Sequence, residues 1–196
     1  MMNVMISIKP KWCERIASGK RTVEPRKTRP DIEPPFKCYI YSTLVRNPIR
    51  DSLALTNRWG QGKRVENPCG AIMEGEFFLN GKIIGEFVCD KVDMLFNGSG
   101  NPENYMRDIL PEILKNTTMS YDEFGVYVWS RGKNKNIHGW HISDLVIYDK
   151  PKELSEFRKP LTCHRGIQRD NCDGCWDCEI KIPPQSWCYC EVSEND

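Results

Sequence analysis

The sequence lacks long apolar runs and a strong charge of one sign. No stretch of its 196 residues approaches the roughly 20 apolar residues that a membrane-spanning helix requires, so we expect no membrane partner. The formal net charge is only +1, so overall charge predicts no particular partner. The opening MMNVMISIKP has neither the apolar segment nor the small-residue cleavage site of a signal peptide, and we expect a cytoplasmic protein.

Cysteine and tryptophan, in contrast, are well represented. The ten cysteines and six tryptophans argue against a disordered chain. The length fits one domain with an appendage. A reducing cytosol does not favour disulfides, so the cysteines need another explanation. We expect the scattered ones to be small buried hydrophobes: Cys13, Cys38, Cys69 and Cys89.

Apolar alternation and turn residues predict short strands separated by short helices. Strands are expected over 4–10, 37–43, 183–192 and from His141 onward, with a hairpin in 71–95 around Asn80-Gly81. Helices are expected over 10–19, over 105–115 with a break near Pro111, and after Ser120, which with Glu123 forms a capping box. Residues 44–70 read as a long loop.

These strands are short and irregularly spaced, which disfavours a doubly wound sheet. We therefore expect an α+β fold, a compact mixed β-barrel of about six strands with short peripheral helices. The barrel is expected over 1–158, a cysteine-rich extension over 159–183, and the final barrel strand with a tail over 184–196.

Positive charge is concentrated near the amino terminus. From Lys9 to Arg29 the chain has eight lysines and arginines against two glutamates, a pattern typical of phosphate binding. Within SGKRTVEPRK, Arg26 could clamp a phosphate, and Glu24 could accept a hydrogen bond or move a proton. Arg21 has the opposite strand parity unless the backbone is irregular. The alternative is a solvated surface on which Glu24 pairs with Arg21 or Arg26.

The same segment carries a family resemblance. ISIKPKWCERIASGKRTVEPRK resembles the start of an ASCH domain of the PUA-like superfamily, whose glycine, basic residue, glutamate and arginine correspond to Gly19, Arg21, Glu24 and Arg26. The resemblance continues in KCYIYST, NGKIIGEFVCDKVD, GWHISDLVIYDKPKELSEF and PPQSWCYCE. It spans most of the chain and is closest to versions from Gram-positive bacteria and their phages.

The resemblance implies a small barrel whose cleft is lined by the charged segment and binds RNA. The resemblance places Arg21, Glu24 and Arg26 along that cleft. The local positive charge adds further candidates for nucleic-acid binding: Lys9, Lys20, Arg131 and Lys133. Some small family members hydrolyse an acetylated cytidine nucleoside with a lysine and a threonine where this chain has Arg21 and Glu24. Arginine does not deprotonate at neutral pH, which argues against that amidohydrolase chemistry here.

A second cationic segment, RGKNKN at 131–136, precedes HGWH. Aromatic side chains next to cations suit a stacked base and its phosphate. The candidates for stacking, each of which the core also explains, are Tyr39, Tyr41, Trp140 and Trp187. His138 and His141 have no carboxylate or cysteine near them in sequence, which disfavours a metal role.

A cluster of cysteines lies in TCHRGIQRDNCDGCWDCEIK. Its two-residue gaps are typical of a metal knuckle, and we expect a structural zinc site formed by Cys163, Cys172, Cys175 and Cys178. Free or partly oxidised thiols, an iron–sulfur cluster, and His164 in place of Cys163 are the alternatives. Cys188 and Cys190 share one face of the last strand and are expected in the core.

Three functions follow from these patterns. The first is a non-catalytic module that binds RNA or a nucleotide. The second is an enzyme, an amidohydrolase or ribonuclease acting on a modified nucleoside or RNA, with Glu24 as general base beside Arg21. The third is a protein-interaction module in which the charges only keep the surface soluble.

Overall fold

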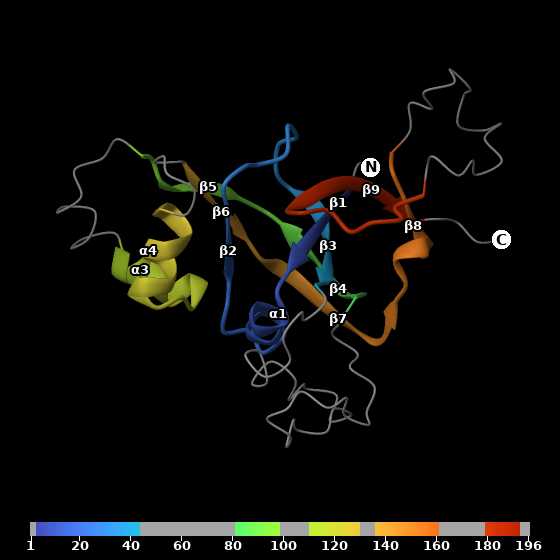
Figure 1. Cartoon of the computed structure of the whole chain (residues 1–196), viewed down its shortest axis with the longest axis horizontal. Coiled ribbons are helices and arrows are strands. Elements are labelled where there is room, and N and C mark those ends of the chain that lie inside the picture. The colour runs from blue at the N-terminus through green and yellow to red at the C-terminus, as the bar shows by residue number, and fades with distance from the viewer. Residues whose placement is uncertain (1–2, 44–80, 99–109, 130–135, 161–178, 193–196) are drawn as a thin grey trace, which may run out of the picture. The chain divides into compact units, whose positions relative to one another are not determined.

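The structure is a computed structural model that describes residues 3–43, 81–98, 110–129, 136–160 and 179–192. The chain divides into two compact units (Figure 1). The first unit comprises 1–14, 37–87 and 146–196, and the second comprises 15–36 and 88–145. No described helix is long and apolar enough to cross a membrane.

A six-stranded sheet forms the frame of the first unit, in the order β7-β4-β3-β1-β9-β8. Its strands are β1 (Asn3–Ile8), β3 (Phe36–Ser42), β4 (Lys82–Cys89), β7 (Ser143–Lys152), β8 (Phe157–Arg158) and β9 (Trp187–Val192). β1 pairs in parallel with β3 and antiparallel with β9. The predicted strands at 4–10, 37–43 and 183–192 are therefore confirmed.

The helix after β1 is also the predicted one. α1 (Pro10–Ala17) begins at a proline, whose missing N–H costs nothing in the first turn of a helix. It ends before Gly19, which has φ 71° and whose N–H donates to the Ile16 carbonyl at 2.8 Å. Glycine adopts this left-handed conformation without a steric penalty, so it stops the helix where the sequence predicts.

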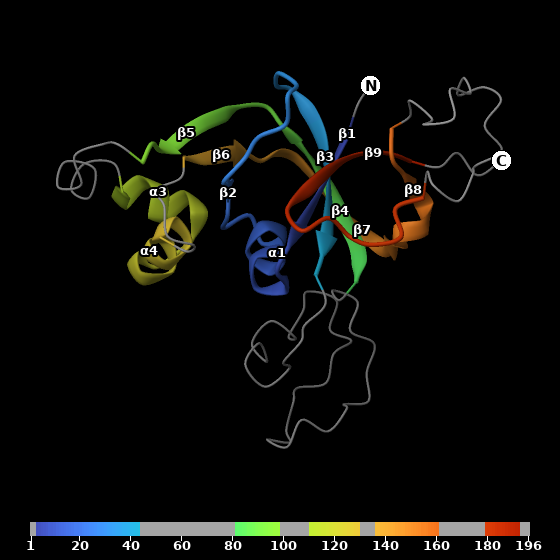
Figure 2. The ribbon, with the colours of Figure 1, turned by 45° about the horizontal axis from the view of Figure 1, so that its top comes forward.

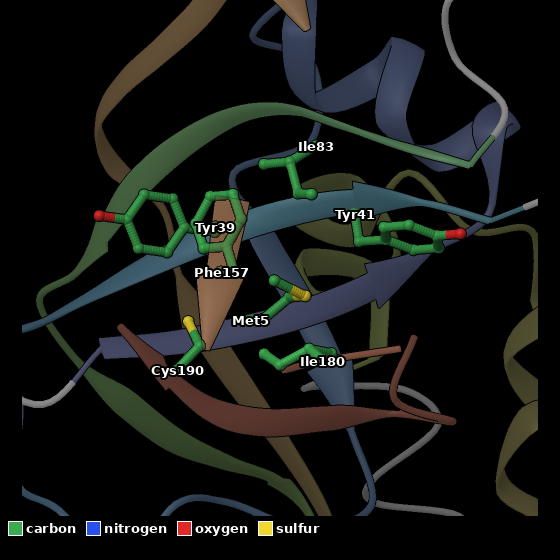
Figure 3. Packing of buried hydrophobic residues seen from close by; sticks show 7 residues of the cluster. All are labelled: Met5, Tyr39, Tyr41, Ile83, Phe157, Ile180 and Cys190. Carbon is green, nitrogen blue, oxygen red and sulfur yellow. The ribbon is translucent and has the colours of Figure 1, made fainter. Parts of the chain in front are cut away.

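Apolar side chains from several strands of the six-stranded sheet form one core cluster (Figure 3). The rings of Tyr39 and Phe157 meet edge to face, with centroids 4.8 Å apart. The buried members of the cluster are Met5, Tyr39, Tyr41, Ile83, Phe157, Ile180 and Cys190. Cys188 packs against it from the same face of β9, as the alternation of that strand predicts.

The second unit contains a three-stranded sheet and two helices (Figures 1 and 2). The strand order is β2 (Val23–Arg26), β6 (Ile137–His141), β5 (Val92–Phe96), and both neighbouring pairs are antiparallel. The helices are α3 (Leu110–Thr117) and α4 (Tyr121–Trp129). A reciprocal pair of hydrogen bonds between Ser120 and Glu123 opens α4, so the predicted capping box is confirmed.

Several expectations need correction. The α+β class is confirmed, but the expected barrel is wrong for the described residues: their strands form two open sheets of six and three strands. α3 begins at Leu110 and Pro111 lies in its first turn, where proline is tolerated; the part of the predicted helix before it lies outside the described residues, so the predicted break is not tested. β6 was not predicted, because its sequence IHGWH does not alternate apolar and polar residues. The loop at 44–70 and the first arm of the hairpin lie outside the described residues.

Candidate functional site

The charged segment after α1 is buried, not a solvated surface. Arg21, Glu24 and Arg26 are 2%, 4% and 8% exposed, and they are the charged residues that are buried in the part of the chain the structure describes. Charged groups are almost never buried unless they are paired. The alternative of a surface ion pair is therefore wrong, and the three side chains require an explanation as a buried cluster.

Glu24 lies between the two arginines. Its Oε2 accepts from Arg21 Nε at 2.7 Å, and its Oε1 is 3.2 Å from Arg26 Nη2. Glu24 and Arg26 share a face of β2, as the two-residue spacing predicts. Arg21 precedes the strand, so strand parity does not constrain it, and it reaches Glu24 from three residues away.

Arg21 also binds the carboxyl end of α3, which lies beside β2 (Figures 1 and 2). Its Nη1 donates to the Thr117 carbonyl, and Arg15 Nη1 donates to the Thr118 carbonyl. The backbone N–H of Thr22 donates to the Asn116 carbonyl at 3.0 Å. The last carbonyls of a helix have no partner within it and carry partial negative charge. Arg21 therefore anchors the charged segment to the helix.

Tyr127 of α4 lies close to the same cluster. Its hydroxyl donates to the Pro25 carbonyl at 3.0 Å, and Lys27 Nζ lies 5.3 Å from the centre of its ring. Burial is the main cause that raises the pKa of Tyr127, and the charge of Glu24 adds to the rise. The tyrosine therefore stays a neutral donor that holds the backbone of β2.

Strand register places β2 against β6, which in turn pairs with β5. Glu24 is opposite Trp140 and Arg26 is opposite His138. Glycine at 139 avoids a steric conflict, because a Cβ there would lie 2.8 Å from side-chain carbons of Val23 and Leu95. Gly139 thus allows the close packing around β6, in a segment that was not predicted to be a strand.

The two histidines of β6 have different surroundings. His141 Nε2 lies 2.8 Å from Asp93 Oδ2, and Lys91 Nζ lies 2.9 Å from Asp93 Oδ1. Burial alone would raise the pKa of Asp93, but hydrogen bonds from Lys91 and His141 outweigh it and lower the pKa. Burial, and then the charge of Arg29, lowers the pKa of His138. Within the described residues, no group of three or more His, Cys, Asp or Glu side chains could hold a metal.

The aromatic candidates for base stacking differ in how deeply they are buried. Tyr39, Tyr41 and Trp140 are buried, so the core interpretation is confirmed for them. The Trp140 ring packs edge to face on Phe36, with centroids 5.7 Å apart. Trp187 is half-buried and packs in the same way on Tyr189 at 5.5 Å.

The other predicted site residues are exposed or lie outside the described residues. Lys9 and Lys20 are exposed. Arg131, Lys133 and the four cysteines predicted to bind zinc (Cys163, Cys172, Cys175 and Cys178) lie outside the described residues. Of the expected core cysteines that are described, Cys188 is half-buried and four are buried: Cys13, Cys38, Cys89 and Cys190.

Two guanidinium groups and one carboxylate give the cluster an excess of one positive charge. Guanidinium groups bind anions such as phosphate through paired hydrogen bonds, so such an arrangement can bind an anion. Both oxygens of Glu24 already face a guanidinium. Glu24 is therefore better suited to positioning the arginines than to acting as a base that removes a proton from a substrate.

The sequence matches no protein-family profile and no curated protein. Among solved structures, the chain is similar to ASCH from Zymomonas mobilis, with 17% identity, a TM-score of 0.45, and coverage of 95% of this chain and 86% of that one. A tyrosine-to-phenylalanine mutant of that protein is similar at 15% identity and a TM-score of 0.45, with coverage of 95% of this chain and 88% of the mutant chain. A serine-to-alanine mutant is similar at 15% identity and a TM-score of 0.42, with coverage of 95% of this chain and 87% of the mutant chain. These three solved structures are all of ASCH from Zymomonas mobilis.

Proposed function

We propose that this chain is an ASCH-like protein that binds RNA or a nucleotide through the cluster of Arg21, Glu24 and Arg26. The observation that carries the proposal is the burial of two guanidinium groups around a single carboxylate. A phosphate bound there would meet the guanidinium group of Arg26. Arginine is suited to this role because its planar fork matches phosphate geometry.

The two arginines have different roles in this proposal. Arg21 is held by Glu24 and by the Thr117 carbonyl, so it supports the cluster. Arg26 has the longer contact to Glu24, and a tenth of its side chain remains exposed. Arg26 is therefore the arginine that meets the phosphate. Exposed cations of the same segment, including Lys20 and Arg29, would add weaker contacts to neighbouring phosphates.

Binding of a mixed-sequence, single-stranded oligoribonucleotide, followed by fluorescence anisotropy over a series of salt concentrations, tests the proposal. We expect affinity to fall as salt rises, since phosphate contacts release counterions. Arg26→Ala should weaken binding by about tenfold or more, the loss expected of a charged hydrogen bond. Lys150→Ala, which removes an exposed charge from β7, is the control and should have little effect.

Equal losses in the two variants, or binding by the wild-type protein that is insensitive to salt, would contradict the proposal. The enzyme alternative is tested in the same samples by analysing the RNA for products. Products formed by the wild-type protein and not by Glu24→Gln, with binding retained in that variant, would make Glu24 a general base.

A further inference from the structure

Strand register aligns three side chains in one row across the three-stranded sheet. Arg26 of β2 is directly opposite His138 of β6, and His138 is directly opposite Met94 of β5. Residues directly opposite each other in antiparallel strands project from the same face. Neighbouring strands lie about 4.8 Å apart, so the row extends roughly 10 Å from Arg26 to Met94.

The row next to it is more enclosed. There Glu24 and Trp140 are buried and Val92 is half-buried. In the first row, exposure increases away from Arg26: His138 is half-buried and Met94 is 50% exposed. One end of the row therefore offers a buried cation, and the other offers an apolar side chain to solvent.

The middle of the row is the imidazole of His138. Arg26 is opposite His138 in the sheet, and the charge of Arg29 acts on its ring and, together with burial, lowers its pKa. A neutral imidazole presents a flat aromatic face on which a base can stack. Met94 adds a flexible, polarisable thioether, which adapts to ligands of different shape.

We infer that Arg26, His138 and Met94 together bind one nucleotide unit, with its phosphate at Arg26 and its base on His138 and Met94. This inference rests on the proposed function and assigns positions to the two parts of the ligand. A free nucleotide and a nucleotide of single-stranded RNA share this chemistry. The length of the row is comparable to the distance from the phosphate of a nucleotide to the far edge of its base.

The test separates the phosphate from the base. Calorimetric titrations would use inorganic phosphate, ribonucleoside 5′-monophosphates, the matching nucleosides and the single-stranded oligoribonucleotide. The variants are His138→Ala, Met94→Ala and their combination. Two controls match them: His141→Ala, on the opposite face of β6, and Val146→Ala, which like Met94 is 50% exposed.

We expect the double variant to bind nucleotide at least about fivefold more weakly than wild type, the lower end of a lost base–aromatic stack. Its affinity for inorganic phosphate should be unchanged, and both controls should bind like wild type. If a ribonucleoside 5′-monophosphate binds more tightly than the oligoribonucleotide, the ligand is a free nucleotide. If the oligoribonucleotide binds more tightly, the ligand is RNA.

Two outcomes would overturn the inference. In the first, wild type and the double variant bind nucleotide with the same affinity, and Arg26→Ala does not bind it. This result would refute the position of the base and leave the proposed function intact. Absence of binding of every probe to wild type would refute both together. Urea unfolding of each variant, measured in parallel, identifies any loss that comes from misfolding.

Discussion

Arg21 joins Glu24 of β2 to the carboxyl end of α3. Its Nε donates to Glu24 Oε2 at 2.7 Å, while its Nη1 donates to the Thr117 carbonyl. One guanidinium therefore links a strand to a helix that is far away in sequence. Because the group is buried, its partners cannot be replaced by water when one is removed, and this makes the cluster sensitive to substitution.

Glu24→Gln should destabilise the protein by about 3–5 kcal/mol, because it removes the carboxylate that faces two buried guanidinium groups. The measurement is the free energy of unfolding in urea. Glu33→Gln is the matched control, since Glu33 is 83% exposed and its ion pair with Arg29 spans 3.7 Å. The control should cost less than about 1 kcal/mol. Similar costs in the two variants would show that the cluster is not a buried network.

Gly139→Ala and Gly125→Ala should have opposite effects on stability. A Cβ at 139 would lie 2.8 Å from carbons of Leu95 and Val23, and such overpacking costs about 1–3 kcal/mol. A Cβ at Gly125 in α4 has no heavy atom within 4 Å, so alanine should stabilise the helix by about 0.5–1 kcal/mol. Thermal unfolding of both variants checks this prediction, and a stabilising Gly139→Ala would disprove the packing around β6.

Acid should weaken the six-stranded sheet through Glu86. Burial alone would raise the pKa of Glu86, but hydrogen bonds from Lys37 and Tyr148 and the charges of Lys37 and Lys152 outweigh it and lower the pKa. The stabilisation is fully present above the pKa of an unfolded glutamate, about 4.3, and is lost as pH falls through the lower folded value. Urea unfolding from neutral to acid pH should show a smaller loss of stability in Glu86→Gln than in wild type. Equal losses would exclude this role.

The amino terminus of α4 should depend on its cap. Ser120 Oγ accepts from the Glu123 N–H at 3.2 Å, and Glu123 Oε2 accepts from the Ser120 N–H at 2.9 Å. Ser120→Ala should lower the free energy of unfolding by about 1 kcal/mol. Ser155→Ala, at an exposed serine of the 3-10 helix Leu154–Glu156, serves as control, and a cost as large as that of Ser120→Ala would argue against the cap.

We also propose, from the sequence, that Cys163, Cys172, Cys175 and Cys178 hold one zinc ion. Thiolates must deprotonate to bind, so zinc occupancy should fall as pH drops. Elemental analysis of protein purified without chelator measures the zinc, and alkylation with and without added zinc measures protection of the thiols. Protein that contains almost no metal, with thiols that zinc does not protect, would leave redox pairing as the explanation.

Local signals were sufficient to predict several elements. Pro10 and Gly19 set the limits of α1, Ser120 and Glu123 set the start of α4, and alternation identified β1 and β9. These features depend on residues that are close in sequence. Whether a sheet closes into a barrel depends on which of its edge strands pair with each other. These strands are far apart in sequence, so no local pattern predicts the pairing.

The candidate site, too, was predictable only where its residues are close in sequence. The two-residue spacing of Glu24 and Arg26 predicted that they share a face, but nothing local showed that Arg21 would turn toward α3 or that the cluster would be buried. The carboxylate beside His141 was missed because Asp93 is contributed by a different strand. The role of Met94 likewise follows only from strand register.

β1 is flanked by β3 on one side and by β9 on the other. β9 contains residues 187–192, so during synthesis β1 has no second neighbour until these residues have been made. Pairing between such distant segments carries a large loop-closure cost and slows folding. Until β9 arrives, one edge of β1 exposes unpaired backbone groups and apolar side chains, the kind of surface that chaperones protect.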